Sequence, residues 1–293
     1  NSVFHPADYA ILSARISPRR LGRAFSVHTF AGNIGWAVAP GIVVFLTALW
    51  DWRVALIAVG LCGLAMTLIL VLQGRVLGTP VGTGAALKPR TPDEPRTATS
   101  QPAGWRLLLT APMLLFFLYM TMSSVASGGL HGFTVTALVN LHGAPLAAAN
   151  GALTALLVAA ALGVLLGGLV ADRVRRHDLV IAAGLGLAAA LLLVIGLAAL
   201  PVVGVTLVMV LVGLARGATL PSRDMMVRSV APEGAMGTVF GFVTTGFNVG
   251  GALAPVFFGW LIDQGQAELV FVIAAAAMVL ALAAALLGNR AAR

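Results

Sequence analysis

Long apolar runs separated by short polar connections make up most of this 293-residue chain. Seven of them lack charged residues over about 19 or more positions, enough for a helix to cross a hydrocarbon core of about 30 Å. These seven runs are Ala24–Leu49, Val54–Gln73, Leu107–Leu141, Ala144–Ala171, Leu179–Leu200, Met236–Ile262 and Leu269–Leu287. Two further helices are expected, Phe4–Ile16, which is too short to span, and Val202–Val227, which carries internal charges. Alternation of polar and apolar residues with period two is absent, so helices are predicted rather than strands.

One stretch of the chain occurs twice, at an offset of 215 residues and without a gap. The matching residues of the first copy are Pro6, Gly22, Phe25, Thr29, Asn33, Gly35, Ala37, Ala39 and Pro40. Those of the second copy are Pro221, Gly237, Phe240, Thr244, Asn248, Gly250, Ala252, Ala254 and Pro255. Two related helical halves around a site at the middle of the membrane are the plan of many secondary transporters. The repeat therefore predicts solute transport.

The repeat also predicts how the chain is divided. Three spanning helices come before the second-copy equivalent of Phe4–Ile16, and the first copy has none of them. We therefore expect that about 110 residues are absent and that the parent has twelve helices, of which this chain holds helices four to twelve. The expected parts are residues 1–73 as the remnant of an N-terminal half, 74–106 as a flexible cytoplasmic linker, 107–289 as a six-helix C-terminal half, and 290–293 as a cytoplasmic tail.

Composition places the chain in lipid. Hydrophobic residues make up 59% and charged residues only 10%, too few to cover a soluble surface. The net charge of +8 would suggest nucleic acid, but the basic residues gather in alternate connections and lack stacking aromatic residues, so nucleic acid is not an expected partner. By the positive-inside rule, those connections and the C-terminus are cytoplasmic. We expect a monomeric multi-pass protein of a bacterial inner membrane; the lone Cys62 offers no disulfide or metal cluster, and no cofactor is expected.

Two motifs resemble those of the major facilitator superfamily. Gly168-Leu-Val-Ala-Asp172-Arg173-Val-Arg175-Arg176 resembles the family's G-x-x-x-D-R-x-G-R-R signature, with Arg175 in place of a glycine. Gly35-Trp-Ala-Val-Ala39-Pro40 is similar to the G-x-x-x-G-P motif of family exporters, with Ala39 in place of the second glycine, and Gly250 to Pro255 repeats it. The resemblance covers the whole chain. It implies an all-α membrane protein, a major-facilitator-type two-half helical bundle truncated to about nine helices, four to twelve.

The same resemblance implies a conformational gate. In the family, the signature aspartate caps a helix of the other half and its arginines hold the cytoplasmic side shut, which places Asp172 near Gly22. A carboxylate at a helix N-terminus is favourable by about 0.3–1 kcal/mol, a strength that allows release. The implied gate residues are Gly168, Asp172, Arg173, Arg176, Gly35, Pro40, Gly250 and Pro255. The alternative is that Gly and Pro are simply common in membrane helices and that the arginines anchor topology.

A narrower resemblance concerns the start of the chain. Asn1-Ser-Val-Phe-His5-Pro6, followed by Gly22-Arg-Ala-Phe25 and Gly32-Asn33, resembles the fosmidomycin-resistance branch of exporters. This implies efflux of a drug or a phosphonate-like solute.

Ionisable residues inside the apolar runs are costly and need a partner or a task. They are Asp8 with the neighbouring His5 on one helix, and Arg216, Arg223 and Asp224 on another. The offset of 215 maps Asp8 onto Arg223, so we hypothesise that these opposite charges face each other across the cytoplasmic half of a cavity. Asp8 would carry the proton, because burial raises the pKa of a carboxyl group and a nearby arginine lowers it. Opening and closing of the cavity would alternate these two environments. Alternatively, Asp224 pairs with Arg228, and Asp8 pairs locally with Arg15 or His5.

Polar residues in the remaining helices are candidate solute contacts. Leu107–Leu141 is longer than a span needs, and its Ser/Gly centre at Ser123–Gly129 suggests a break that lines the cavity. The candidates are His131, Tyr119 and Asn140, together with the repeat-equivalent Asn33 and Asn248, which alternatively join helices. Histidine as a residue type titrates near neutral pH, but His28, His131 and His142 could each be a hydrogen-bonded structural histidine.

Together these features predict a proton-coupled exporter of small molecules that works by alternating access. Arg216 and Arg223 favour an anionic or phosphonate-like solute, and the partners are the solute, protons and the lipid bilayer. One alternative is proton-coupled or facilitated uptake of a small organic acid; another is a membrane fragment that does not transport. A membrane-embedded enzyme is not expected, because the sequence contains no convergent catalytic or metal-binding spacing.

Overall fold

The computed structural model describes residues 4–74, 105–232 and 235–292. Within those ranges the chain is built of helices joined by short connections, which confirms the predicted all-α membrane fold. The helices are α1 (Phe4–Arg15), the 3-10 turn η1 (Pro18–Arg20), α2 (Leu21–Leu49), α3 (Trp52–Leu72), α5 (Trp105–Leu108), α6 (Ala111–His142), α7 (Leu146–Arg173), α8 (His177–Leu197), α9 (Val202–Val230), α10 (Met236–Asp263) and α11 (Glu268–Ala291). Most of the expected linker lies outside the described residues.

Seven helices of the described part are long and apolar enough to cross a membrane, namely α3 and α6 to α11. As expected, α1 is short, with 12 residues. The predicted Leu107–Leu141 helix is interrupted, but not at its Ser/Gly centre. The interruption falls at Leu109–Thr110, where Thr110 is the N-cap and Pro112 fixes the first turn of α6. Ser123–Gly129 lies within continuous helix, so the expected central break was wrong.

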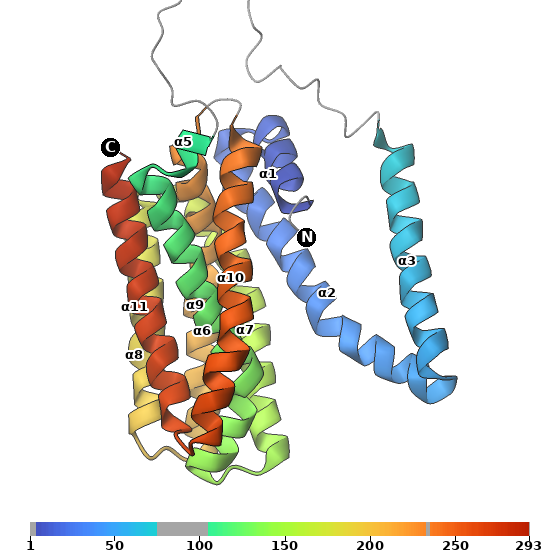
Figure 1. Cartoon of the computed structure of the whole chain (residues 1–293), viewed down its shortest axis with the longest axis vertical. Helices are drawn as coiled ribbons and strands as arrows, with labels where there is room; N and C mark the ends of the chain where they lie inside the picture. Colours follow the sequence, from blue (N-terminus) through green and yellow to red (C-terminus); the bar gives the residue numbers. More distant parts are fainter. Residues whose placement is uncertain (1–3, 75–104, 233–234, 293) are drawn as a thin grey trace, which may run out of the picture.

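Helices α6 to α11 pack together as one bundle. Neighbouring pairs are α7 with α9, α6 with α10 and α11, and α8 with α9 and α11. In Figure 1, α2 contacts this bundle near α1, and the distance between α2 and the bundle grows toward the opposite end of the bundle. α3 follows α2 and stands apart from the bundle. The connection between α1–α3 and the bundle is therefore concentrated at one end of the molecule.

Glycines let the backbones of α7 and α9 come into direct contact. A Cβ on Gly163 would lie 3.0 Å from the Leu214 Cα atom of α9, and one on Gly213 would lie 3.0 Å from the Ala159 Cβ atom of α7. Small residues allow this close approach in lipid, where helix association depends on van der Waals packing. The α7–α9 interface is therefore a closely packed part of the bundle.

The two copies of the glycine-proline motif differ in packing. Gly250 on α10 faces the backbone of α6, and a Cβ there would lie 2.8 Å from Ser124 Cβ. At Gly35 on α2 an added Cβ would meet no atom within 4 Å. The close helix contact expected from the motif is thus present in the second copy, whereas in the first copy Gly35 makes none. The side chain of Pro40 lies outside the described residues.

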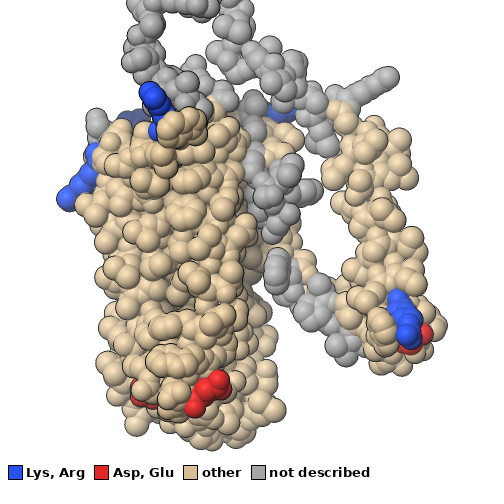
Figure 2. Space-filling view, viewed as in Figure 1, with Lys and Arg blue, Asp and Glu red and all other residues tan. Residues whose placement is uncertain are grey.

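Charged residues mark the two ends of the bundle. One end, here called the basic end, carries arginines at η1 and the start of α2, after α7 and near the end of α11. The opposite end carries Asp263 and Glu268, and Arg53 lies beside Asp51 where α2 meets α3. Figure 2 shows the same segregation, with Lys and Arg mainly at one end and Asp and Glu at the other.

Two hydrophobic cores divide the bundle along its length. One core contains buried residues of α6 to α11 and none of α1 or α2 among those described. The other joins Tyr9, Leu21 and Phe25, from α1 and α2, to residues of the bundle that include Met113 and Phe240. The buried residues of α1 and α2 belong to this second core alone. The second core therefore joins α1 and α2 to the bundle and closes the basic end.

Candidate functional site

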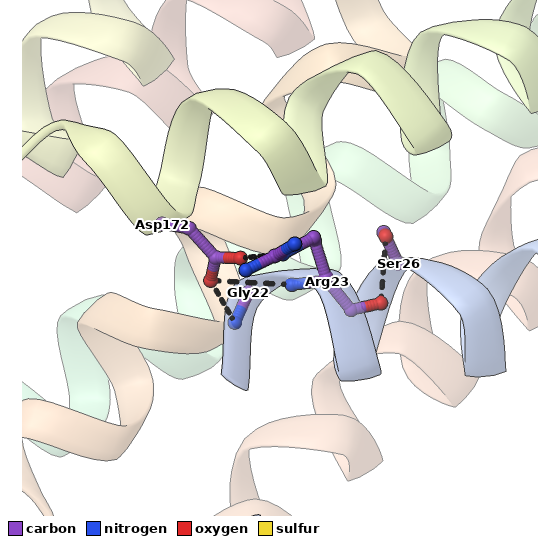
Figure 3. A network of polar contacts seen from close by, with 4 residues as sticks. All are labelled: Gly22, Arg23, Ser26 and Asp172. Atoms are coloured by element: carbon purple, nitrogen blue, oxygen red, sulfur yellow. Dashed lines mark hydrogen bonds and ion pairs between the residues drawn. The ribbon is translucent and has the colours of Figure 1, made fainter. Parts of the chain in front are cut away.

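Asp172, at the end of α7, caps the first turn of α2. Its Oδ1 atom accepts hydrogen bonds from the backbone N–H of Gly22 at 2.8 Å and of Arg23 at 3.3 Å, and its Oδ2 atom pairs with Nε of Arg23 (Figure 3). The first N–H groups of a helix have no partner within the helix, so a carboxylate there satisfies them and also opposes the positive end of the helix dipole. The Asp172 side chain is only 6% exposed. The expected position of Asp172 at Gly22 is confirmed.

The spacing of Gly168 and Asp172 follows from this contact. Four residues apart, both lie on the face of α7 that meets α2. A Cβ on Gly168 would overlap Ser26 of α2 and lie 3.1 Å from the Gly22 carbonyl oxygen. A Cβ on Gly22 would in turn lie 2.8 Å from Asp172 Oδ1. The glycines bring the helices close enough for the cap to form.

Two arginines of the loop, Arg173 and Arg176, take no part in the Asp172 cap in the described structure. Arg173 is exposed, and Arg176 pairs at 3.1 Å with Asp178, two residues further along the same segment. The cation that meets Asp172 is Arg23, from α2. Sequence reasoning missed Arg23 because the signature describes only its own loop; the available signal was that Arg23 follows the repeated Gly22.

A second contact between the two parts joins residues that are themselves repeat equivalents. The hydroxyl of Tyr9 on α1 donates to Oδ2 of Asp224 on α9 at 2.9 Å, and the two are separated by 215 residues, the repeat offset. Arg223 holds the other oxygen of Asp224, at 2.7 Å from Nη2 and 2.8 Å from Nε. Asp224 is 1% exposed.

The hypothesised contact between Asp8 and Arg223 is replaced by two others. Asp8 lies 3.6 Å from Nε2 of His28 on α2, and Arg223 pairs with its neighbour Asp224. Residues 8 and 9 point about 100° apart on a helix, so the repeat located the helix pair but not the facing side chain. The alternative of a local Asp224–Arg228 pair was also wrong, because Asp224 is held by Arg223 and Tyr9. The side chain of His5 lies outside the described residues.

Aromatic rings surround the Tyr9 hydrogen bond. The Tyr9 ring stacks on Phe240 of α10 at 4.4 Å and meets Phe25 of α2 edge-on at 4.9 Å. Phe25 and Phe240 are fully buried and are equivalent in the repeat. Because α1 contacts α10 and α2 contacts α9, the two copies meet reciprocally, as expected when a two-fold axis passes between Tyr9 and Asp224. The closed basic end is therefore built around the axis of internal symmetry.

Arg216 lies apart from these pairs. Its guanidinium donates to Oγ of Ser127 on α6, and Ser127 in turn donates to the Ser123 carbonyl at 2.7 Å. His131, one helical turn further along α6, is exposed and close enough to interact electrostatically with Arg216. In the part of the chain that the structure describes, no carboxylate lies within ion-pair distance of Arg216.

Of the other candidate solute contacts, Tyr119 is close enough to interact electrostatically with Arg216. Tyr119 is fully buried on α6, Asn33 is half-buried on α2, and Asn140 and Asn248 are exposed on α6 and α10. Of the polar candidates, the structure brings together Arg216, His131 and Tyr119, with Ser127 of the Ser/Gly stretch bonded to Arg216.

His142 has a structural contact. Its Nε2 atom lies 3.1 Å from the Ile195 carbonyl oxygen near the end of α8, so it joins two helices. This confirms the structural interpretation for His142. Among the residues that the structure describes, no group of three His, Cys, Asp or Glu side chains could hold a metal ion.

The class of protein follows from these features. A multi-span helical bundle with an internal repeat, closed at one end by contacts between the repeat copies, has the architecture of a secondary membrane transporter. The sequence model described as Major Facilitator Superfamily matches residues 1–156 and 120–293, and the chain belongs to this family. No curated protein matches the chain. Members of the family are transporters, so this chain is an integral multi-pass membrane transporter that acts on small molecules.

Proposed function

We propose that the protein is a proton-coupled exporter of small anionic or phosphonate-like molecules, of the fosmidomycin-resistance branch. The observation that carries the proposal is Arg216, an arginine within a spanning helix that has a serine but no carboxylate beside it in the described structure. An uncompensated charge at membrane depth is costly. A solute that brings its own negative charge would offset that cost and would bind between α6 and α9.

The arrangement of the helices supports alternating access. The basic end is cytoplasmic under the positive-inside rule, and there α1 and α2 pack against the bundle. At the other end α2 leans away (Figure 1), which suits a state open to the outside. Rocking then requires the Asp172 contact to open and close. The proposed gate comprises Gly168, Asp172, Arg173 and Arg176, with bending at Gly35, Pro40, Gly250 and Pro255.

The expected division of the chain fits this mechanism. Residues 1–73 and 107–289 would move as the two parts, with residues 74–106 as the connection and 290–293 as a tail. Asp8 is the proposed proton carrier, since it is partly exposed and lies beside His28, close to the contact between the parts. His5, Arg223 and Asp224 complete the proposed coupling group. His131, Tyr119, Asn33, Asn140 and Asn248 are the proposed solute contacts.

Transport into inside-out membrane vesicles tests the proposal, with labelled fosmidomycin as the phosphonate probe. An acid-inside gradient should drive accumulation by the wild type. Arg216→Gln should abolish it, and Arg216→Lys should retain part of it, because lysine keeps the charge but not the planar fork. Arg228→Gln, which removes another arginine from α9, is the matched control. Accumulation by Arg216→Gln at the wild-type rate would refute the anion site.

Coupling and direction have separate tests. Asp8→Asn should leave downhill transport measurable and abolish its response to the pH gradient, whereas unchanged coupling would exclude Asp8 as the carrier. Gradient-driven accumulation in right-side-out vesicles, with none in inside-out vesicles, would indicate uptake of an organic acid by the same cation instead of export.

A further inference from the structure

We propose that Tyr9 and Asp224 form a clasp on the internal symmetry axis that holds the cytoplasmic side closed, in addition to the Asp172 contact. The inference rests on the proposed alternating-access function. It assigns a task in the transport cycle to Tyr9 and makes the hydrogen bond at 2.9 Å between α1 and α9 its central contact.

The position of the pair gives it this task. Of the ring contacts of Tyr9, the stacking on Phe240 crosses from α1 to the bundle, whereas the contact with Phe25 stays between α1 and α2. Separation of the two parts must therefore break the Tyr9–Asp224 and Tyr9–Phe240 contacts together and can leave Tyr9–Phe25 intact. A contact on the axis joins the parts at their centre, whereas Asp172 joins them at the α2–α7 flank.

The charge of Asp224 is secured independently of the clasp. A buried carboxylate is stable only when it is paired, and Arg223 supplies two hydrogen bonds from the same helix. Asp224 therefore stays paired with Arg223 when Tyr9 leaves, and water that enters the opened end can replace the lost donor. The clasp can release without leaving an unpaired charge inside the protein.

The test measures cysteine alkylation from both sides of the membrane. Cys62, on the exposed face of α3, is the chain's lone cysteine and is first replaced by alanine. Leu12→Cys, half-buried beside the basic-end core, reports opening of the cytoplasmic side. Gly132→Cys, where a Cβ meets no atom within 4 Å, reports closing of the other side.

Tyr9→Phe keeps the ring and removes only the hydroxyl. Hydrogen bonds to charged groups shift equilibria by about tenfold or more, so alkylation at Leu12→Cys should rise by about that factor while alkylation at Gly132→Cys falls. Thr219→Val is the matched control, because within the described part of the chain its buried hydroxyl bonds the Arg216 carbonyl of its own helix. In an Asp224→Asn background, the effect of Tyr9→Phe should be smaller, because a charged acceptor has become neutral.

Each outcome separates the clasp from general loosening and from the proposed function. Faster labelling at both reporters, a result equal to that of Thr219→Val, or full additivity with Asp224→Asn would overturn the clasp. Asp172→Asn provides the reference for the proposed function. If Asp172→Asn shifts the reporters in opposite directions and Tyr9→Phe does not, the clasp fails and alternating access stands. If Asp172→Asn also produces no opposite shift, alternating access itself fails.

Discussion

Substitution of Gly168 by alanine should weaken the closed state without weakening the bundle. The added methyl group points from α7 toward α2, where it would overlap the Ser26 side chain and lie 3.1 Å from the Gly22 carbonyl oxygen. Overpacking of a tight interface costs about 1–3 kcal/mol, and here the cost falls only on the state in which α2 and α7 touch. The closed-to-open ratio should therefore fall by about 5- to 150-fold, since 1.4 kcal/mol corresponds to a factor of ten.

The neighbouring Gly167 provides the matched control. A methyl group there would lie 2.7 Å from Ala218 Cα and 2.8 Å from its carbonyl carbon, both on α9 of the same bundle. Gly167→Ala should thus lower the unfolding temperature in detergent without shifting alkylation between the two sides. Gly168→Ala should shift alkylation between the two sides without lowering the unfolding temperature. Ser26→Gly should partly reverse that shift by removing the overlapping side chain. The reasoning is refuted if both alanine variants lower stability equally and neither changes accessibility.

Three further predictions concern stability, each measured by thermal unfolding in detergent. Asp51→Ala should cost about 1 kcal/mol and Asp51→Ser little, because Asp51 caps α3 by accepting from two backbone N–H groups at 2.6 and 2.9 Å; equal melting of the two variants would contradict the cap. His142→Leu should cost about 0.5–1.5 kcal/mol through loss of the contact with α8; wild-type stability would show that this contact contributes nothing. Gly250→Ala should cost about 1–3 kcal/mol and its repeat equivalent Gly35→Ala almost nothing, because only Gly250 faces a neighbouring helix; equal losses would indicate that both copies pack alike.

The fold was largely predictable because lipid imposes a simple length rule. Apolar runs long enough to span became helices with ends shifted by a few residues, as in α2, which begins at Leu21 instead of Ala24. The exception was Leu107–Leu141, where a proline set the start of α6 and the Ser/Gly centre continued as helix. Small residues there accept side chains of α10, so Gly128 faces Ala254, and packing outweighs the tendency of glycine to interrupt helices.

The site was predictable where a motif implies a specific contact. It was not predictable where the rotation of a helix about its own axis determines which side chain faces the neighbouring helix. Asp172 was placed at Gly22 because its signature implies a cap. The repeat predicted that α1 lies against α9. The candidate contact residues Asp8 and Arg223 were chosen by their charge, so the uncharged Tyr9 was not considered. The available signal was that Tyr9 is the repeat equivalent of the charged Asp224 and lies next to Asp8 in the sequence. Only coordinates show which side of α1 faces the bundle.

The Tyr9–Asp224 contact sets a condition on how this architecture can be assembled. Rotation of two identical subunits about the same axis would set tyrosine against tyrosine or aspartate against aspartate, and two buried aspartates would repel each other. A donor opposite an acceptor at that point requires that the two copies differ in sequence. Fusion of the copies into a single polypeptide permits that divergence, and a homodimer of either half could not reproduce it.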